Sequence, residues 1–322
     1  MATPRKRQIC LAQTPYYHCV SRCVRRAFLC GMDRLTGRSF EHRRDWIEAR
    51  LHQLAGAFAI DVAAYAIMSN HHHVVLRVAP AEAGSWSGAE VCERWGRLFR
   101  LPENVERYLS GELTDPLERE TAKARIAVYR ERLMSVSWFM KCLNTDIARA
   151  ANREDNCTGR FFEGRFKCQA LLDEAALLQC MAYVDLNPVR AGMARMAETA
   201  THTSLARRVK KNWNGLLPFA DQTGAPDNLS KPESNLWASS IPFTFDDYRA
   251  LVRWTVENLR AKRVVAQPPP LRSVDIDTRT WHKTMQAGAL ERARALGAPR
   301  RLRAFAAAIG QAWMWGDSPI VA

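Results

Sequence analysis

The chain has 322 residues, of which 47% are hydrophobic and 25% charged, which suits one large soluble domain or two modest ones. There is no run of about 18 apolar residues, so the sequence predicts no membrane span. The basic N-terminus is not followed by the apolar stretch of a secretory signal, and we therefore expect a cytoplasmic protein.

The net charge of +14 is unevenly distributed along the chain. Residues 1–50 hold eleven Lys and Arg against four Asp and Glu, and residues 251–322 hold twelve against five. The stretch between them is balanced, so the excess charge lies at the two ends. Such basic ends favour a polyanionic partner, chiefly nucleic acid, although a solvated charged surface also explains the C-terminal part.

Nine cysteines are present, an odd number. The closest group, Cys19, Cys23 and Cys30, lacks the paired Cys-x2-Cys spacing of a structural zinc site. We therefore expect reduced thiols, as is usual in the cytosol.

Hydrophobic patterning predicts strands and helices in a mixed order. The predicted strands are 15–22, 60–68, 72–78 and 160–172, and the predicted helices are 43–58, 137–152, 174–186, 245–261 and a basic end at 285–315. Residues 80–135 read as a helical insert, and residues 212–243 as a linker or long surface loop. The pattern predicts an α+β sheet domain followed by a helical basic region.

The segment from Met68 to Leu76 contains three consecutive histidines. Alternate residues of a strand share a face, so His71 and His73 point together and His72 points away. Two imidazoles on one face can coordinate a divalent metal ion. A solvated strand edge, or two histidines satisfied without metal, is the competing interpretation.

A second segment runs from Tyr183 to Gly192. Tyr183 and Asn187 are four residues apart on the predicted helix, which ends near Asn187 because Pro188 disfavours the helical conformation of the residue before it. A tyrosine here can act as a nucleophile if a metal polarises its target, and the Asn187 carbonyl can be a further ligand. Core packing of the tyrosine is the alternative.

A third segment, Gly164 to Lys167, places Arg165 and Lys167 among phenylalanines. Cationic side chains meet phosphates, and aromatic rings stack on bases. The same composition is found in an ordinary amphipathic strand, so both interpretations stay open.

Taken together, these segments resemble a known family. Residues 70–76 are similar to the HUH signature of single-tyrosine transposases, and residues 183–192 are similar to the tyrosine helix of the REP-associated branch. Further similarity lies in residues 17–22, 140–144 and 159–167, so the resemblance covers roughly residues 10–205.

The resemblance implies a ferredoxin-like antiparallel sheet and cleavage of single-stranded DNA through a 5′-phosphotyrosine link. It implies Tyr183 as the nucleophile, with His71, His73 and Asn187 as ligands of Mg²⁺ or Mn²⁺. Its DNA partner is a hairpin-forming repeat. We assign DNA binding to Arg22, Arg165, Lys167 and Arg190. The protein would be a monomer or homodimer, associated with the nucleoid when bound to DNA.

The expected organisation is a catalytic domain at 1–205, a linker at 206–243 and a helical basic region at 244–322. His72 departs from the usual hydrophobic middle residue of the signature. Two other functions remain open: a hydrolase that uses metal-activated water, and a non-catalytic or domesticated nucleic-acid-binding protein.

Overall fold

The computed structural model describes residues 4–24, 29–33, 36–211, 215–222, 238–261, 271–272, 274–286, 290, 293–312 and 314. Its centre is a five-stranded sheet in the order β2-β3-β1-β4-β5. The strands are β1 (Tyr16–Arg22), β2 (Ile60–Ile67), β3 (His71–Val78), β4 (Lys167–Leu171) and β5 (Ala295–Leu296). The first four are antiparallel neighbours, and β5 runs parallel to β4.

Two helices complete a ferredoxin-like unit with the first four strands. Helix α1 (Arg43–Ala57) connects β1 to β2, and helix α6 (Val136–Glu154) precedes β4, which gives the order βαββαβ. The predicted α+β, ferredoxin-like fold is thereby confirmed. No helix in the described part of the chain combines the length and apolar character needed to cross a membrane.

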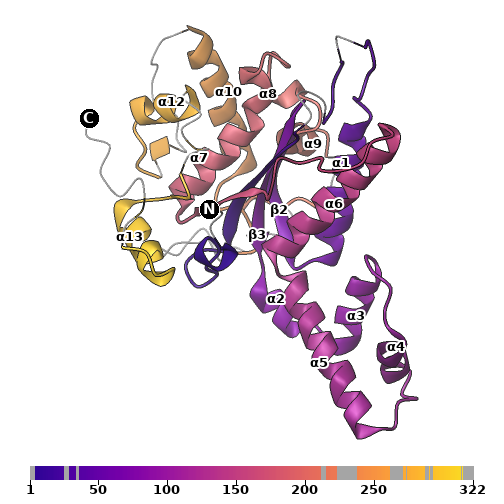
Figure 1. The fold of residues 1–322 in the computed structure, drawn as a ribbon. Coiled ribbons are helices and arrows are strands. Elements are labelled where there is room, and N and C mark those ends of the chain that lie inside the picture. The colour runs from indigo at the N-terminus through magenta and orange to yellow at the C-terminus, as the bar shows by residue number, and fades with distance from the viewer. Residues whose placement is uncertain are drawn as a thin grey trace.

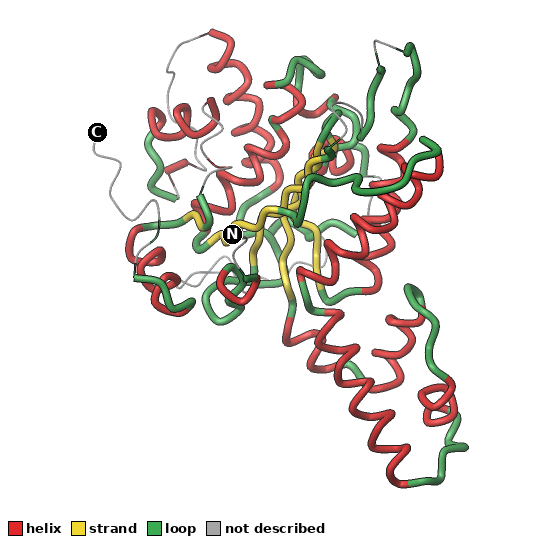
Figure 2. Tube along the Cα trace, in the orientation of Figure 1, coloured by secondary structure: helices red, strands yellow, loops and turns green. Residues whose placement is uncertain are grey.

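The sheet separates two hydrophobic cores (Figures 1 and 2). Helices α1 and α6 cover one face, where Val74 and Leu76 of β3 are buried. The other face is covered by α7 (Glu174–Asp185), α10 (Phe245–Ala261) and α12 (Thr278–Gln286), and Val75 is buried there. Because successive strand residues point to opposite faces, β3 supplies side chains to both cores in alternation.

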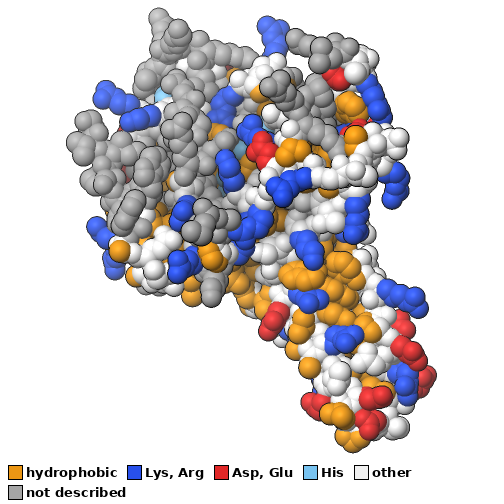
Figure 3. Space-filling view, viewed as in Figure 1, with side chains coloured by type: hydrophobic (Ala, Val, Ile, Leu, Met, Phe, Trp, Pro, Cys, Tyr) orange, Lys and Arg blue, Asp and Glu red, His pale blue; other side chains and the backbone are white. Residues whose placement is uncertain are grey.

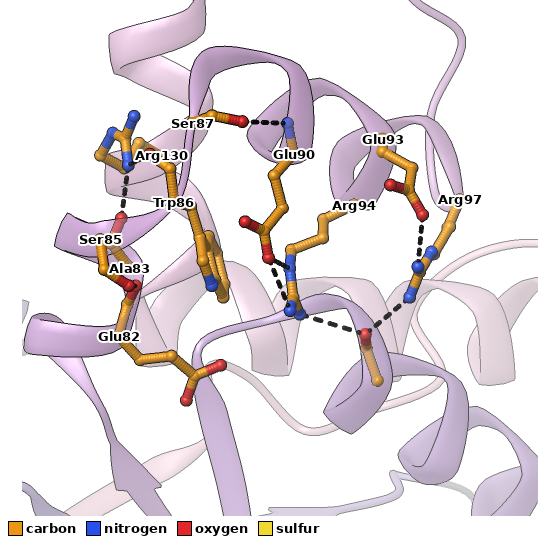
Figure 4. A network of polar contacts seen from close by, with 11 residues as sticks. Glu82, Ala83, Ser85, Trp86, Ser87, Glu90, Glu93, Arg94, Arg97 and Arg130 are labelled. Atoms are coloured by element: carbon orange, nitrogen blue, oxygen red, sulfur yellow. Dashed lines mark hydrogen bonds and ion pairs between the residues drawn. The ribbon is translucent and has the colours of Figure 1, made fainter.

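The predicted helical insert is present and projects from the sheet as an arm (Figure 1). It consists of α2 (Pro80–Ser85), α3 (Gly88–Gly96), α4 (Glu103–Leu109) and α5 (Pro116–Leu133). Figure 4 shows its junction with the core: Arg94 of α3 and Arg97, directly after that helix, both donate to the backbone oxygen of Gly56, at 3.5 and 3.0 Å. Gly56 lies in the last turn of α1, whose carbonyls lack partners within the helix, so α3 caps α1.

One predicted strand is longer than the observed one. Strand β4 begins at Lys167, whereas residues 160–166 are irregular. The adjacent rings of Phe161 and Phe162 are both buried and pack edge to face, 5.1 Å between centroids. Two consecutive side chains entering one core are incompatible with the alternation of a strand.

The C-terminal part also differs from a single helix over residues 285–315. Helix α12 ends at Gln286, β5 follows, and α13 spans Pro299–Ala308. Gly297 separates β5 from α13 with a φ of +154°, and a Cβ there would lie 2.8 Å from Leu172 Cβ. Only glycine fits such a close approach without displacing the backbone.

The remaining short helices are η1 (Arg5–Arg7), α8 (Asn187–Arg190), η2 (Ala197–Thr199) and α9 (Ser204–Val209). Of the predicted linker, residues 212–214 and 223–237 lie outside the described residues. Leu217, Phe219 and Ile241 are buried in the hydrophobic core on the α7 side of the sheet, here called the α7-side core. The division into three regions stays a prediction. All nine cysteines are free thiols, as expected.

Candidate active site

The three histidines of β3 divide between the two faces of the sheet, as the strand pattern predicts. The rings of His71 and His73 lie together, with centroids 4.8 Å apart and planes at 73°. His73 belongs to the face covered by α7. His72 instead packs edge to face against Phe162 of the α1-side core, 5.9 Å between centroids.

His72 is completely buried, which excludes the solvated-edge interpretation of the triplet. Neither of its ring nitrogens has a hydrogen-bond partner among the described residues. Burial, together with the nearby His71, lowers the pKa of His72 to about 3. The ring therefore behaves as a neutral packing element.

His73 is also completely buried, but its polar atoms are organised. Its Nδ1 lies 2.9 Å from Nε2 of His18 on β1, and the two rings stack with centroids 5.2 Å apart. Its Nε2 has no hydrogen-bond partner within the described part of the chain. Burial, and then the neighbouring histidines, lower the pKa of His73 well below its ordinary value. A neutral imidazole with an unused buried nitrogen is suited to bind a metal ion.

His71 is half-buried at the start of β3. Its Nδ1 lies 2.5 Å from Oδ1 of Asn70, and a carbonyl oxygen only accepts. Nδ1 therefore carries the proton in the neutral ring, and the lone pair resides on Nε2. The two histidines fit a metal ion held through their Nε2 atoms.

His18 and Gln169 were missed as site residues by sequence reasoning. Gln169 Oε1 lies 3.2 Å from His18 Nδ1, so a chain of polar contacts runs from β4 through β1 to His73. The available signal was strand alternation: His18 shares a face with Tyr16 and therefore faces α7. Which strand lies beside β3 could not be known without the sheet order.

Tyr183 lies on α7 next to His73. The ring centroids are 6.0 Å apart at 74°, and Tyr183 is 2% exposed. The guanidinium of Arg190 stacks over the tyrosine ring, 3.7 Å from its centroid. The structure therefore brings His71, His73 and Tyr183 together, with the tyrosine in a buried position.

Asn187 begins α8, with Pro188 after it and Leu186 between α7 and α8. Its Oδ1 accepts a hydrogen bond from Arg190 Nη2 at 2.7 Å, and its Nδ2 is buried without a partner in the described structure. Arg190 thus contacts both Asn187 and Tyr183, so these two side chains lie on one side of the segment. A metal ion at Oδ1 would stand beside a guanidinium, which opposes it electrostatically. The assignment of Asn187 as third ligand stays a prediction.

The tyrosine helix is anchored by a buried carboxylate. Asp185 accepts from the hydroxyls of Ser204 and Tyr248, each at 2.6 Å, and from the Leu205 amide at 3.1 Å. Burial raises the pKa of Asp185, while these donors favour its charged form. The contacts join α7 to α9 and α10.

The other predicted DNA-binding residues are Arg22, the last residue of β1, Lys167, the first residue of β4, and Arg165, which precedes β4. Arg22 is opposite His71 in the β1–β3 register and is half-buried. Arg165 and Lys167 are exposed, and Lys167 is opposite Val20. Because Val20 is itself opposite His73, Lys167 and Arg22 lie close to the histidine end of the sheet.

A second group of potential ligands involves different residues. One ligand atom each from Asp45, Glu48 and His202 lies within 4.8 Å of the others. Arg207 already bonds Glu48, however, and Tyr65 donates to the same carboxylate at 2.7 Å. Burial opposes ionisation of Glu48, but the hydrogen bonds from His202, Arg207 and Tyr65 outweigh it and lower the pKa to about 2. These contacts make the group an ion-paired cluster that could also accept a cation.

No protein-family model matches the chain, and no curated protein matches it. Among solved structures, the chain is similar to a REP-associated tyrosine transposase bound to a REP hairpin. That similarity covers 66% of this chain and 88% of the other, with 11% sequence identity and a TM-score of 0.39. So weak a likeness leaves the function to be inferred from the site residues.

Proposed function

We propose that this protein is a metal-dependent transposase-type nuclease that cleaves and rejoins hairpin-forming single-stranded DNA through a covalent bond to Tyr183. The observation that carries the proposal is the grouping of His71 and Tyr183 around His73. Its ring centroid lies 4.8 Å from that of His71 and 6.0 Å from that of Tyr183, and its Nε2 has no partner among the described residues. A packing role for the tyrosine would not require an unpartnered imidazole nitrogen beside it.

His71 and His73 would hold Mg²⁺ or Mn²⁺, which supplies charge neutralisation at the phosphate oxygens when bound. The Tyr183 hydroxyl then attacks phosphorus. A tyrosine O–P bond forms, the bond from phosphorus to the 3′-oxygen breaks, and the proton lost by the phenol is matched by one gained by the 3′-oxygen. The 5′-phosphotyrosine retains the phosphodiester energy, so a 3′-hydroxyl can later displace the tyrosine and rejoin the strand.

Arg190 would change partners when DNA binds. In the free protein its Nη2 donates to Asn187 Oδ1 at 2.7 Å and to the Tyr183 backbone oxygen at 3.2 Å. A phosphate is a stronger acceptor for a guanidinium than a neutral amide. If the Arg190 guanidinium moved to the phosphate, the Tyr183 ring would be uncovered. Asn187 Oδ1 would then be available to bind the metal ion. This accounts for a nucleophile that is buried before the substrate arrives.

The distribution of charge favours DNA contact on the core rather than on the distal arm. On the face in Figure 3, Lys and Arg predominate over the core, whereas most of the visible Asp and Glu lie on the arm, among further Lys and Arg. At the tip of the arm, residues 103–120, the exposed acidic residues outnumber the exposed basic Arg107 and Arg119; they are Glu103, Glu106, Glu112, Asp115, Glu118 and Glu120. Negative charge repels phosphates, so Arg22, Arg165 and Lys167 are the better candidates for backbone contacts.

The test is Tyr183→Phe, assayed on end-labelled hairpin DNA with Mg²⁺ or Mn²⁺. The wild-type protein should give a DNA–protein adduct that survives denaturing electrophoresis, and Tyr183→Phe should give none, because the variant has no attacking oxygen. Tyr16→Phe is the matched control, since Tyr16 is also buried on the α7 side of the sheet.

The outcomes also separate the competing functions. Cleavage that persists in Tyr183→Phe and is abolished by a chelator would indicate a hydrolase with a water nucleophile. Salt-dependent binding without cleavage, unchanged in Tyr183→Phe and His73→Ala, would indicate a nucleic-acid-binding protein without catalysis. An adduct formed by Tyr183→Phe would overturn the assignment of the nucleophile.

A further inference from the structure

The polar chain that ends at His73 begins in the C-terminal part of the molecule. Gln169 of β4 donates its amide to two backbone oxygens, those of Leu290 and Ala293, the latter at 2.8 Å. Both acceptors are carbonyls, so the amide nitrogen must face them. Gln169 Oε1 is consequently the atom that faces His18.

This orientation decides where the ring protons lie. An amide oxygen only accepts, so His18 Nδ1 carries a proton and donates to Gln169 Oε1 across 3.2 Å. In the neutral ring the lone pair of His18 is then on Nε2. His73 Nδ1, 2.9 Å from that atom, must carry the proton and donate. The lone pair of His73 is therefore on Nε2, the buried nitrogen with no partner among the described residues.

We propose that a C-terminal segment (Leu290 and residues 293–298), acting through Gln169 and His18, fixes the tautomer of His73 that can bind a metal ion through Nε2. Gln169 and His18 are positioning residues, because neither is the group that holds the metal. The inference rests on the proposed function for the presence of the metal. Metal-bound histidines generally have such partners on their other nitrogen, where the partner sets the tautomer and ring orientation.

The C-terminal segment is held against the site at two further points. Strand β5 pairs with β4 at Ala170 and Leu171, directly after Gln169. The amide of Ala298 donates to Asp173 Oδ2 at 2.6 Å, and Asp173 Oδ1 caps α7 through the Ala176 amide at 2.8 Å. The same segment therefore positions both the chain of contacts from Gln169 through His18 to His73, here called the relay, and the beginning of the tyrosine helix.

Two measurements on the full-length protein test the relay. The first is the tautomer of His73 in metal-free protein, from ¹⁵N-histidine NMR, in which protonated and unprotonated ring nitrogens have distinct shifts. The second is Mn²⁺ affinity by titration calorimetry. Wild-type His73 should be protonated at Nδ1. Because loss of such a partner typically weakens metal binding about 10–100-fold, Gln169→Leu and His18→Leu should each do so.

His18→Gln is the rescue variant, because its amide oxygen can accept from His73 Nδ1 in place of the imidazole, and it should retain most of the Mn²⁺ affinity. Cys168→Ala is the matched control: Cys168 is buried on the same strand but faces the α1-side core, so affinity should be unchanged. Gly297→Ala tests the segment from a distance, since its Cβ would meet Leu172 Cβ at 2.8 Å and displace β5. It should weaken Mn²⁺ binding as Gln169→Leu does.

Protonation of wild-type His73 at Nε2 would overturn the relay. So would unchanged Mn²⁺ affinity in both Gln169→Leu and His18→Leu, or equal losses in His18→Gln and His18→Leu, since that would indicate a purely structural role. If the wild-type protein binds no Mn²⁺, the proposed function falls, while the NMR measurement still decides whether the relay exists.

Discussion

On the face of the sheet covered by α1 and α6, β3 buries His72 with Val74 and Leu76 against a largely apolar core. On the face covered by α7, the same strand buries His73 beside His18 and Tyr183. The two histidines are adjacent in sequence and equally buried, yet one contacts a phenylalanine and the other a chain of polar groups.

The difference teaches that burial alone does not identify a functional histidine. Within the described part of the chain, both nitrogens of His72 lack a partner, whereas His73 lacks one at Nε2 and has its Nδ1 2.9 Å from Nε2 of His18. A lone pair fixed on one nitrogen is the property that the proposed metal site requires, and a ring without a hydrogen-bond partner lacks it. The pair therefore offers an internal control for every experiment on the site.

The largest expected effect is a division between these two positions. His73→Ala should abolish Mn²⁺ binding and lower DNA cleavage about a thousandfold or more, because metal stabilisation of the transition state is worth several kcal/mol. His72→Leu should leave both close to wild type. Circular dichroism of each variant checks the fold, and His71→Ala, at a half-buried position, repeats the test with a smaller structural disturbance.

The proposed difference between His72 and His73 would be contradicted if His72→Leu lost Mn²⁺ binding while remaining folded. In that case the metal would be held by a different pair of nitrogens, and the assignment of faces to functions would be reversed.

A smaller effect concerns the link between the two faces. Glu48 of α1 bonds Arg207 of α9, a helix whose Leu205 lies in the α7-side core. The pKa of Glu48 is about 2, below its ordinary value of 4.5. A lowered folded-state pKa means that the stabilisation is fully present above pH 4.5 and is lost as the pH falls toward 2.

Glu48→Gln should therefore be less stable than wild type at pH 7 by about 1–2 kcal/mol, a figure reduced for solvent screening, and the difference should vanish near the folded-state pKa. Urea unfolding at several pH values measures it. Glu93→Gln is the control, because the Glu93–Arg97 pair is exposed on α3. A constant difference at all pH values would show that Glu48 acts through packing rather than charge.

Strand alternation and helix periodicity predicted most of the sheet and its covering helices. The division of His71, His72 and His73 between two faces needed only a period of two residues. The strand prediction for residues 160–166 was wrong because Phe161 and Phe162 are both buried, and their tertiary packing overrides the local strand pattern. The helix predicted over residues 285–315 was too long because Gly297 lies close to Leu172, a residue directly after β4 and more than a hundred positions earlier in the chain.

The site was predicted in part. Tyr183 and His73 do meet, but their burial and the contacts of Arg190 with Asn187 were not visible from spacing. His18 and Gln169 were not predicted because their contacts with His73 depend on which strands are neighbours. The strand order β2-β3-β1-β4 determines these neighbours, and no local sequence pattern reveals it.

The smallest expected effect returns to His72 and concerns stability instead of catalysis. Both of its ring nitrogens are buried without partners in the described structure, and each such group has a desolvation cost. His72→Leu removes these atoms while retaining much of the volume against Phe162. We expect the free energy of unfolding at pH 7 to rise by about 1 kcal/mol, measured by urea denaturation.

His72→Gln is the control: it keeps a buried polar group and should give no gain in the free energy of unfolding. If His72→Leu were instead destabilised, His72 would have a polar partner in solution, and Ser21, which lies opposite it on β1 and accepts from Asn144 at 2.8 Å, is the nearest polar group in the β1–β3 register.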